Sequence, residues 1–205
     1  MKSMIRRLSA CAVCGVSILL AACQSIPDKA SGVEQQRESI QKHAEETLAR
    51  LYTEYPKAKA QIAAAAGYAV FDLSSVNAVL LVGQKGRGMM VNSKTRIPTY
   101  MKALRAGTGP GLGYQELRQV FIFANEAAME QFLLGKAAGG DVSASATVGT
   151  SNVQQSFNPY ISTYQITEKG FALQANWGGT AYLADPDLAC DGGRCPALPP
   201  TSSVK

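Results

Sequence analysis

The hydrophobic positions of the chain repeat first with the period of a helix and then with that of a strand. Apolar or small residues recur every three or four positions at Ile40, Ala44, Thr47/Leu48, Leu51 and Tyr55. This spacing predicts an amphipathic helix, which a capping box at 31–34 would start and Pro56 would end. A second, alanine-rich helix is predicted over 57–66, ending at Gly67.

From Tyr68 onward, short apolar runs bounded by glycine predict strands. The run 78–82 and the segment 89–91 would form a hairpin around the glycine-rich sequence 83–88. Further strands are expected at 68–71, 117–124, 142–148, 160–167 and 171–177, the last two turned at 168–170. Asn125 can cap a helix that runs to Leu134.

Helices that precede a series of strands favour an α+β fold over βαβ units. We expect the N-terminal helices to pack on a mostly antiparallel β-sheet or partly closed barrel, with one further helix between strands. The domain would span 34–184, and the proline-containing segment 185–205 is predicted to be an irregular tail.

The first 22 residues have the pattern of an export signal. Lys2, Arg6 and Arg7 precede an uncharged, largely apolar run, 8–22, which is shorter than the roughly 20 residues that span a bilayer. The run ends in Leu20-Ala21-Ala22-Cys23, the pattern of a bacterial lipobox, in which the cysteine is acylated. An ordinary secretory signal followed by a chance cysteine is the alternative.

We therefore expect a lipoprotein signal peptide over 1–22, acylation of Cys23 with fatty acids such as palmitate, and a tether over 23–33. Gln24, where an aspartate would favour retention, favours sorting to the outer membrane, with the domain facing the periplasm. Removing the leader lowers the formal net charge from +5 to +2, because three of the 20 Lys and Arg residues lie in it. This charge does not indicate a nucleic-acid partner.

Two of the five cysteines, Cys11 and Cys14, would leave with the signal. Cys190 and Cys195 enclose four residues, and an exported pair this close predicts a local disulfide. A metal site would need further thiolate or imidazole ligands nearby, and none are present in the sequence around them. We expect no metal and no cofactor.

The segment between Asp72 and Glu116 contains no acidic residue. It carries six cations: Lys85, Arg87, Lys94, Arg96, Lys102 and Arg105. Unopposed cations among apolar side chains suit an anionic membrane surface. Alternatively, these cations form a solvated face and pair with acids of the N-terminal helices.

The sequence from Gly83 to Gly88 could present backbone N–H groups and two cations to a phosphate. Its glycines are not in the order of a nucleotide-binding P-loop. A hairpin turn is the second interpretation, and it is the one we favour.

Few residues point to catalysis. His43 is the single histidine, and no nucleophile elbow or histidine-based metal motif is present. Asp72, Glu116 and Asp141 could act as acid or base only if the fold gathered them in one pocket. We therefore expect no enzyme activity. An envelope hydrolase is a further alternative, which ranks behind the two non-catalytic functions given below.

Several blocks match a known family in order and spacing. They are 64–71, 82–89, 113–115 through 121–123, 127–132, 140–144 and 169–173. Over these blocks the run from Ile40 to about Asp185 resembles the SYLF family of lipid-binding domains, called actin-binding in yeast relatives. The resemblance implies binding of anionic phospholipid, with phosphatidylglycerol or cardiolipin as the natural ligands in a bacterial envelope.

The resulting expectation is an outer-membrane-anchored, non-catalytic lipoprotein whose SYLF-like domain binds anionic phospholipid through the six cations. Acyl chains on Cys23 would supply a second membrane contact. The alternative is an envelope scaffolding lipoprotein that binds a protein partner through its N-terminal helix.

Overall fold

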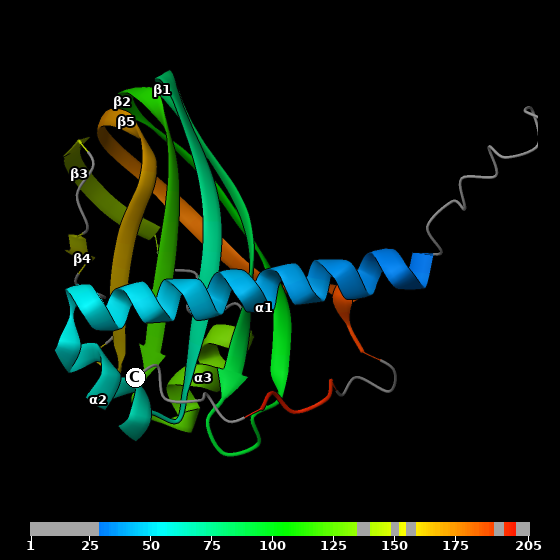
Figure 1. Ribbon diagram of the computed structural model, residues 1–205. Helices are drawn as coiled ribbons and strands as arrows, with labels where there is room; N and C mark the ends of the chain where they lie inside the picture. Colours follow the sequence, from blue (N-terminus) through cyan, green and yellow to red (C-terminus); the bar gives the residue numbers. More distant parts are fainter. Residues whose placement is uncertain (1–28, 135–139, 149–151, 155–158, 191–194, 200–205) are drawn as a thin grey trace, which may run out of the picture. The chain divides into compact units, whose positions relative to one another are not determined.

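The computed structural model describes residues 29–134, 140–148, 152–154, 159–190 and 195–199 (Figure 1). The chain divides into two units, 1–34 and 35–205. Of the first unit, the structure describes the first turns of a helix. All contacts discussed below lie within the second unit.

Three α-helices belong to the described part of the chain. They are α1 (Lys29–Glu54), α2 (Pro56–Ala64) and α3 (Glu126–Leu133). The predicted stripe on α1 is confirmed, because Ala44, Thr47, Leu48 and Leu51 are buried. The predicted cap of α3 is also present: the Asn125 side chain accepts a hydrogen bond from the backbone N–H of Ala128 at 2.9 Å.

Helix α1 begins at Lys29, two residues before the predicted capping box at 31–34. The expected start was wrong because Lys and Ala continue a helix at little cost, so nothing in the sequence stops it at Ser31. Residues 29–33 of the expected tether are therefore helical.

Five strands form one antiparallel sheet. They are β1 (Gly67–Asn92), β2 (Pro98–Phe123), β3 (Gly140–Val148), β4 (Asn152–Gln154) and β5 (Ile161–Ala184). The order is β1-β2-β5-β3, and β4 also pairs with β5. The described strands do not close into a barrel. The fold is α+β, as predicted, with helices packed against the sheet.

Strands β1, β2 and β5 are each far longer than the roughly 5–6 residues of an ordinary strand. Figure 1 shows all three rising together, bending sharply at one end and returning, so that the sheet folds over on itself. We call this bend the apex. At the apex Val79 is paired with Gly111.

The predicted hairpin at 78–91 and the predicted turn at 168–170 were wrong. Gly83–Gly88 lies within β1, and residues 168–170 lie within β5. The chain reverses instead at 93–97, between β1 and β2. Glycine is found at turns, but within a strand it also marks a bend or a close approach of two backbones. In β1 the glycines lie within the strand and not at a turn.

A register shift between Val79 and Leu81 reverses which residues of β1 face the core. Before the shift, odd-numbered Phe71 and Leu73 belong to the core; after it, even-numbered Met90 does. Val79 adopts a φ of 60°, a left-handed conformation that costs a β-branched residue about 1–3 kcal/mol. The irregularity thus re-aims the second half of β1.

The main core fills the interior of the folded sheet. Five aromatic rings pack there at centroid distances of 4.8 to 6.2 Å: Phe71, Phe121, Phe123, Phe132 and Tyr182. Helix α3 contributes Phe132 and Met129 to this cluster. Each of these rings buries a large apolar area, so the cluster stabilises the folded sheet.

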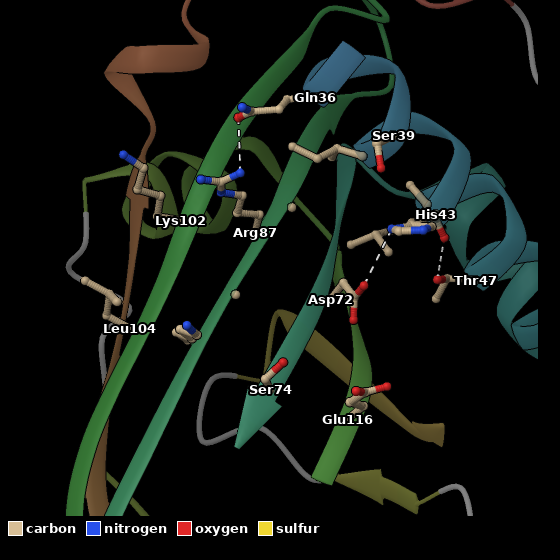
Figure 2. Close-up of a pocket in the computed structure, with 16 residues that line it drawn as sticks. Gln36, Ser39, His43, Thr47, Asp72, Ser74, Arg87, Lys102, Leu104 and Glu116 are labelled. Atoms are coloured by element: carbon tan, nitrogen blue, oxygen red, sulfur yellow. Dashed lines mark hydrogen bonds and ion pairs between the residues drawn. The ribbon is translucent and has the colours of Figure 1, made fainter. Parts of the chain in front are cut away.

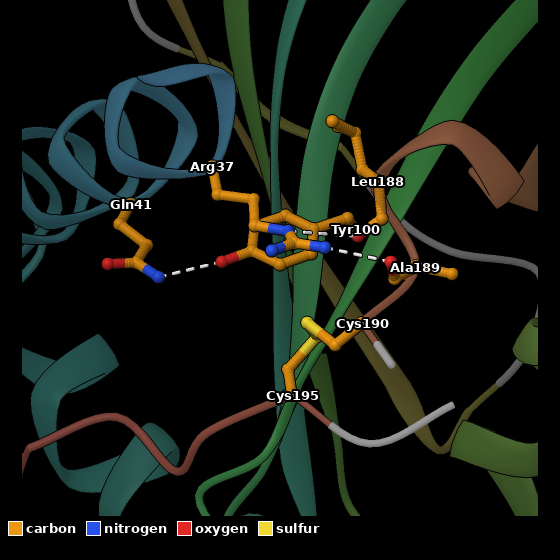
Figure 3. The surroundings of a disulfide bond; sticks show 7 residues. All are labelled: Arg37, Gln41, Tyr100, Leu188, Ala189, Cys190 and Cys195. Atoms are coloured by element: carbon orange, nitrogen blue, oxygen red, sulfur yellow. Dashed lines mark hydrogen bonds between the residues drawn. A yellow bond between two sulfur atoms is a disulfide. The ribbon is translucent and has the colours of Figure 1, made fainter. Parts of the chain in front are cut away.

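The C-terminal segment is fastened to the domain, and its described residues 189–190 and 195–199 belong to no helix or strand. It contains the short 3₁₀ helix η2 (Pro186–Leu188). The predicted disulfide Cys190–Cys195 is present, with an S–S distance of 2.08 Å. Figure 3 shows Arg37 of α1 donating to the carbonyls of Leu188 and Ala189, at 3.2 and 2.8 Å.

In the part of the chain that the structure describes, no helix combines the length and the apolar character needed to cross a membrane.

Candidate functional site

A cavity of about 640 Å³ lies between α1 and the folded sheet, within the usual size range of small-molecule sites. Helix α1 contributes one wall, and the two halves of β1 together with β2 contribute the others (Figure 2). The apolar part of the lining consists of Ile40, Ala44, Val70 and Leu104. The polar part carries charges of both signs.

Glycines in β1 create this site by letting the two halves of the strand touch. A Cβ atom at Gly86 would overlap the backbone oxygen of Asp72, and one at Gly88 would overlap that of Val70. Because neither residue has a side chain, the second half of β1 passes directly against the first, under α1. The Gly83–Gly88 sequence is thus a packing device beside a cavity.

Asp72 and Glu116 form the acidic side of the cavity, and Asp72 faces α1. Figure 2 shows His43 pointing toward Asp72, with 3.5 Å between the imidazole Nδ1 and a carboxylate oxygen. The backbone carbonyl of His43 accepts a hydrogen bond of 2.6 Å from the Thr47 hydroxyl. Glu116 of β2 lines the same cavity.

Lys85 and Arg87 form the basic side. Both are exposed on the second half of β1, where the register shift at the apex turns odd-numbered residues toward the cavity. Arg87 donates to the amide oxygen of Gln36 at 3.1 Å. Among the described residues, neither cation has a carboxylate within ion-pair distance, so both can contact an anion.

Lys102 also lines the cavity, but two acids of the C-terminal segment hold it. Its ammonium lies 2.8 Å from Asp185 and 2.9 Å from Asp187. The hydrogen bond to Asp185, followed by that to Asp187, raises the pKa of Lys102. Its charge is therefore already balanced within the domain.

The structure does not gather all six predicted cations. Lys94 and Arg96 lie at the β1–β2 turn, roughly 25 Å along the strand from Lys85. Lys94 pairs with Glu126 at 2.6 Å, and this hydrogen bond raises its pKa. The Arg96 guanidinium donates to the carbonyl of Pro199 at 2.6 Å. The alternative interpretation expected these cations to pair with acids of the N-terminal helices. Lys94 does pair with an acid, but that acid, Glu126, belongs to α3, and the partner of Arg96 is a backbone carbonyl.

Arg105 is half-buried in β2, paired with Gln84. Of the six cations predicted to bind lipid, Lys85 and Arg87 are therefore the two that line the cavity and have no acidic partner among the described residues.

The acids singled out in the sequence are partly brought together, because Asp72 and Glu116 line one cavity. Asp141 lies in β3, where side-chain positions fall outside the description. The gathering of two acids meets part of the condition set for a hydrolase. Among the described residues, however, no group of three His, Cys, Asp or Glu side chains could hold a metal ion.

The cavity also uses α1 residues that the sequence interpretation left out, chiefly Gln36 and Ser39. Together with His43 and Thr47 they recur every three or four positions, so they share one face of the helix. That polar stripe borders the buried stripe, and Thr47 belongs to both. It is the signal that could have identified them.

No family model and no solved structure matches the chain. The chain is similar to a protein named Beta cell expansion factor A from Aeromonas veronii, at 37% identity over 153 residues. The matched region covers 74% of this chain and 58% of that relative, so the chain spans little more than half of the relative's length.

Proposed function

We propose that the domain is a non-catalytic module that binds anionic phospholipid at a membrane surface, with the phosphate at Lys85 and Arg87. The observation that carries the proposal is the position of these two cations at a cavity without an acidic partner of their own. An alkylammonium and a guanidinium together provide the donors that a phosphate diester requires.

The rest of the lining fits the remainder of an amphiphile. Ile40, Val70 and Leu104 offer apolar contacts beside the two cations. A phospholipid presents a phosphate next to glycerol and acyl carbons, so it can satisfy both kinds of surface at once. A small hydrophilic anion would leave the apolar contacts unused.

The sequence resemblance to SYLF domains supports the same ligand class. The lipobox ending at Cys23 supports attachment of the chain to a bacterial outer membrane by acyl chains, with the domain held close to the bilayer. Both are parts of the proposal. The scaffolding alternative is tested by the same experiment, because a scaffold needs no lipid contact apart from the anchor.

The test is co-sedimentation of the unacylated chain 24–205 with vesicles at low and high salt. One set contains phosphatidylcholine alone, and the other contains phosphatidylcholine with phosphatidylglycerol. We expect binding to the anionic vesicles and weakening by salt, because salt screens exposed charges. The double variant Lys85→Glu, Arg87→Glu should lose at least tenfold in apparent affinity.

The matched control is Lys57→Glu, Lys59→Glu, which makes the same charge change on exposed positions of α2. It should retain most of the binding. If both double variants lose binding equally, the contact is one of overall charge and the cavity is not the site. If the parent chain binds neither vesicle type, the anchor is the sole lipid contact and scaffolding becomes the better hypothesis.

A further inference from the structure

Large apolar side chains are exposed together at the apex of the sheet. They are Val76 (52% exposed), Val79 (69%), Leu80 (62%), Leu81 (68%), Leu112 (64%) and Tyr114 (47%). We call these six residues the apical patch. They come from the bends of two neighbouring strands, where Figure 1 shows β1 and β2 turning over.

The sheet register places three of these side chains, Val76, Leu112 and Tyr114, next to one another, and Val79, Leu80 and Leu81 follow in β1. Val76 of β1 is directly opposite Tyr114 of β2, and Ala78 is opposite Leu112. Residues two apart on a strand share a face, so Val76 and Ala78 lie on the same face as their partners. Contiguous exposed apolar surface of this kind marks an interaction site in a soluble domain.

The backbone at the patch adds independent support. Val79 is held at a φ of 60° at the register shift, where glycine would be the unstrained choice. The backbone at Val79 thus favours glycine, yet the sequence there is Val79-Leu80-Leu81. All three of these bulky apolar side chains are exposed to solvent. Strain of this kind concentrates at functional positions.

We propose that the apical patch inserts into the acyl region of a lipid bilayer while the cavity binds headgroups. The inference rests on the proposed lipid-binding function and names the surface that enters the membrane. Lys85 lies four residues from Leu81 on β1, about 13 Å along the strand. With the patch buried 5–10 Å below the headgroup boundary, the side chain of Lys85 reaches the phosphates, and Arg87 lies about 7 Å further from the patch along the strand.

The charges around the patch favour a bilayer over a protein partner. No acidic residue occurs between Asp72 and Glu116, so the chain that forms this end of β1 and β2 carries no negative charge. Tyr114 marks the border of the patch, because its hydroxyl donates to Glu116 at 2.8 Å. An aromatic ring with a polar tip between apolar and charged zones is typical of a membrane interface.

The experiment places an environment-sensitive fluorophore at the apex of the unacylated chain 24–205. Because Cys190 and Cys195 are paired, Leu81→Cys introduces a single free thiol for an NBD label. With anionic vesicles, the label should shift to the blue and be quenched by lipids that carry a nitroxide on the acyl chain. Leu134→Cys is the matched control, because Leu134 is equally exposed, at 68%, at the C-terminus of α3.

A second measurement removes the apolar surface without introducing a label. Leu80→Ser, Leu81→Ser should weaken binding to anionic vesicles at least tenfold, with an unchanged melting temperature because both side chains are exposed. Leu134→Ser should leave vesicle binding within twofold of the parent. Sedimentation at several concentrations without lipid should give a monomer for the parent chain.

The outcomes separate this inference from the proposed function. Salt-sensitive binding with no spectral change at position 81 overturns insertion and leaves headgroup binding standing. Equal insertion into neutral and anionic vesicles supports the apical patch and overturns the role of Lys85 and Arg87. Self-association that Leu80→Ser, Leu81→Ser abolishes, without vesicle binding by the parent, overturns both and makes a second copy of the chain the occupant.

Discussion

Gly88 packs against the backbone carbonyl of Val70, and a Cβ atom at position 88 would overlap the carbonyl oxygen. Both residues belong to β1, on opposite sides of its bend. The contact joins the two halves of β1, and Gly86 makes an equivalent approach to Asp72. The cavity under α1 exists because the strand can cross itself here.

Gly88→Ala should therefore destabilise the domain by about 2–3 kcal/mol. The obstacle is backbone, which cannot move aside as a flexible side chain could. Urea unfolding followed by circular dichroism measures the change as a shift in midpoint at constant slope.

Gly83→Ala is the control, since a Cβ atom there meets no atom within 4 Å. It should change the free energy of unfolding by no more than about 0.5 kcal/mol. Equal losses at positions 83 and 88 would show that the crossing of β1 does not determine the cost.

The fold class and the helices could be predicted from the sequence, whereas the length of the strands could not. The apolar stripe of α1 and the Asn125 cap are local signals, and both are confirmed. The glycines at 83–88 and the segment 168–170 predict turns, but both lie within strands. Composition alone does not distinguish a turn from a bend within a long strand, because both need small or polar residues.

The site was predicted only in part for a similar reason. The sequence identified Lys85, Arg87 and the acids Asp72 and Glu116 as candidates. Which of them share a cavity depends on the register shift at Val79, which changes the facing of the following residues. A shift of one residue leaves no mark on composition, and its effect is large because strand side chains alternate between faces.

The acids of the cavity should oppose anion binding. Asp72 lines the same cavity as Lys85 and Arg87, so Asp72→Asn should strengthen binding to phosphatidylglycerol vesicles by about two- to fivefold at low salt. Co-sedimentation measures the effect, and the gain should shrink in high salt.

Glu130→Gln makes the same charge change on an exposed position of α3, outside the cavity lining. Its effect should stay below that of Asp72→Asn. Weaker binding by Asp72→Asn, with an unchanged melting temperature, would place the ligand elsewhere.

The disulfide should stabilise the domain modestly. Cys190 and Cys195 are five residues apart, and closing so short a loop contributes about 2 kcal/mol in the chain-entropy description. Cys190→Ser, Cys195→Ser should therefore still fold, with its melting temperature lowered by several degrees.

The double serine variant should keep the contact of Arg37 with the Leu188 and Ala189 carbonyls, because these lie before the closed loop. Limited proteolysis checks this point. Cleavage should appear after Ala189 and not within η2, whereas Arg37→Ala should expose η2 as well.

Glu168 links α1 to the sheet through two arginines. Its carboxylate lies 2.6 Å from Arg50 of α1 and 3.3 Å from Arg118 of β2. Glu168→Gln leaves two guanidinium groups close together with less compensating charge, and should cost about 1–3 kcal/mol. Glu54→Gln is the matched control, because Glu54 pairs with the same Arg50 within one helix and such pairs contribute at most about 0.5 kcal/mol.

Stability in alkali should depend on Tyr68. Burial raises the pKa of its hydroxyl above the ordinary value of 10.0, against a smaller lowering by the charge of Arg96. In the unfolded chain this tyrosine loses its proton near pH 10, whereas in the folded chain it keeps the proton to higher pH. The unfolded state therefore binds fewer protons above pH 10, and the free energy of unfolding falls as the pH rises through that region.

Tyr68→Phe removes this contribution, so its urea midpoint should fall less between pH 9 and pH 11 than that of the parent chain. Tyr160→Phe, at an exposed position, should follow the parent. If all three midpoints fall in parallel, ionisation of Tyr68 is not coupled to unfolding.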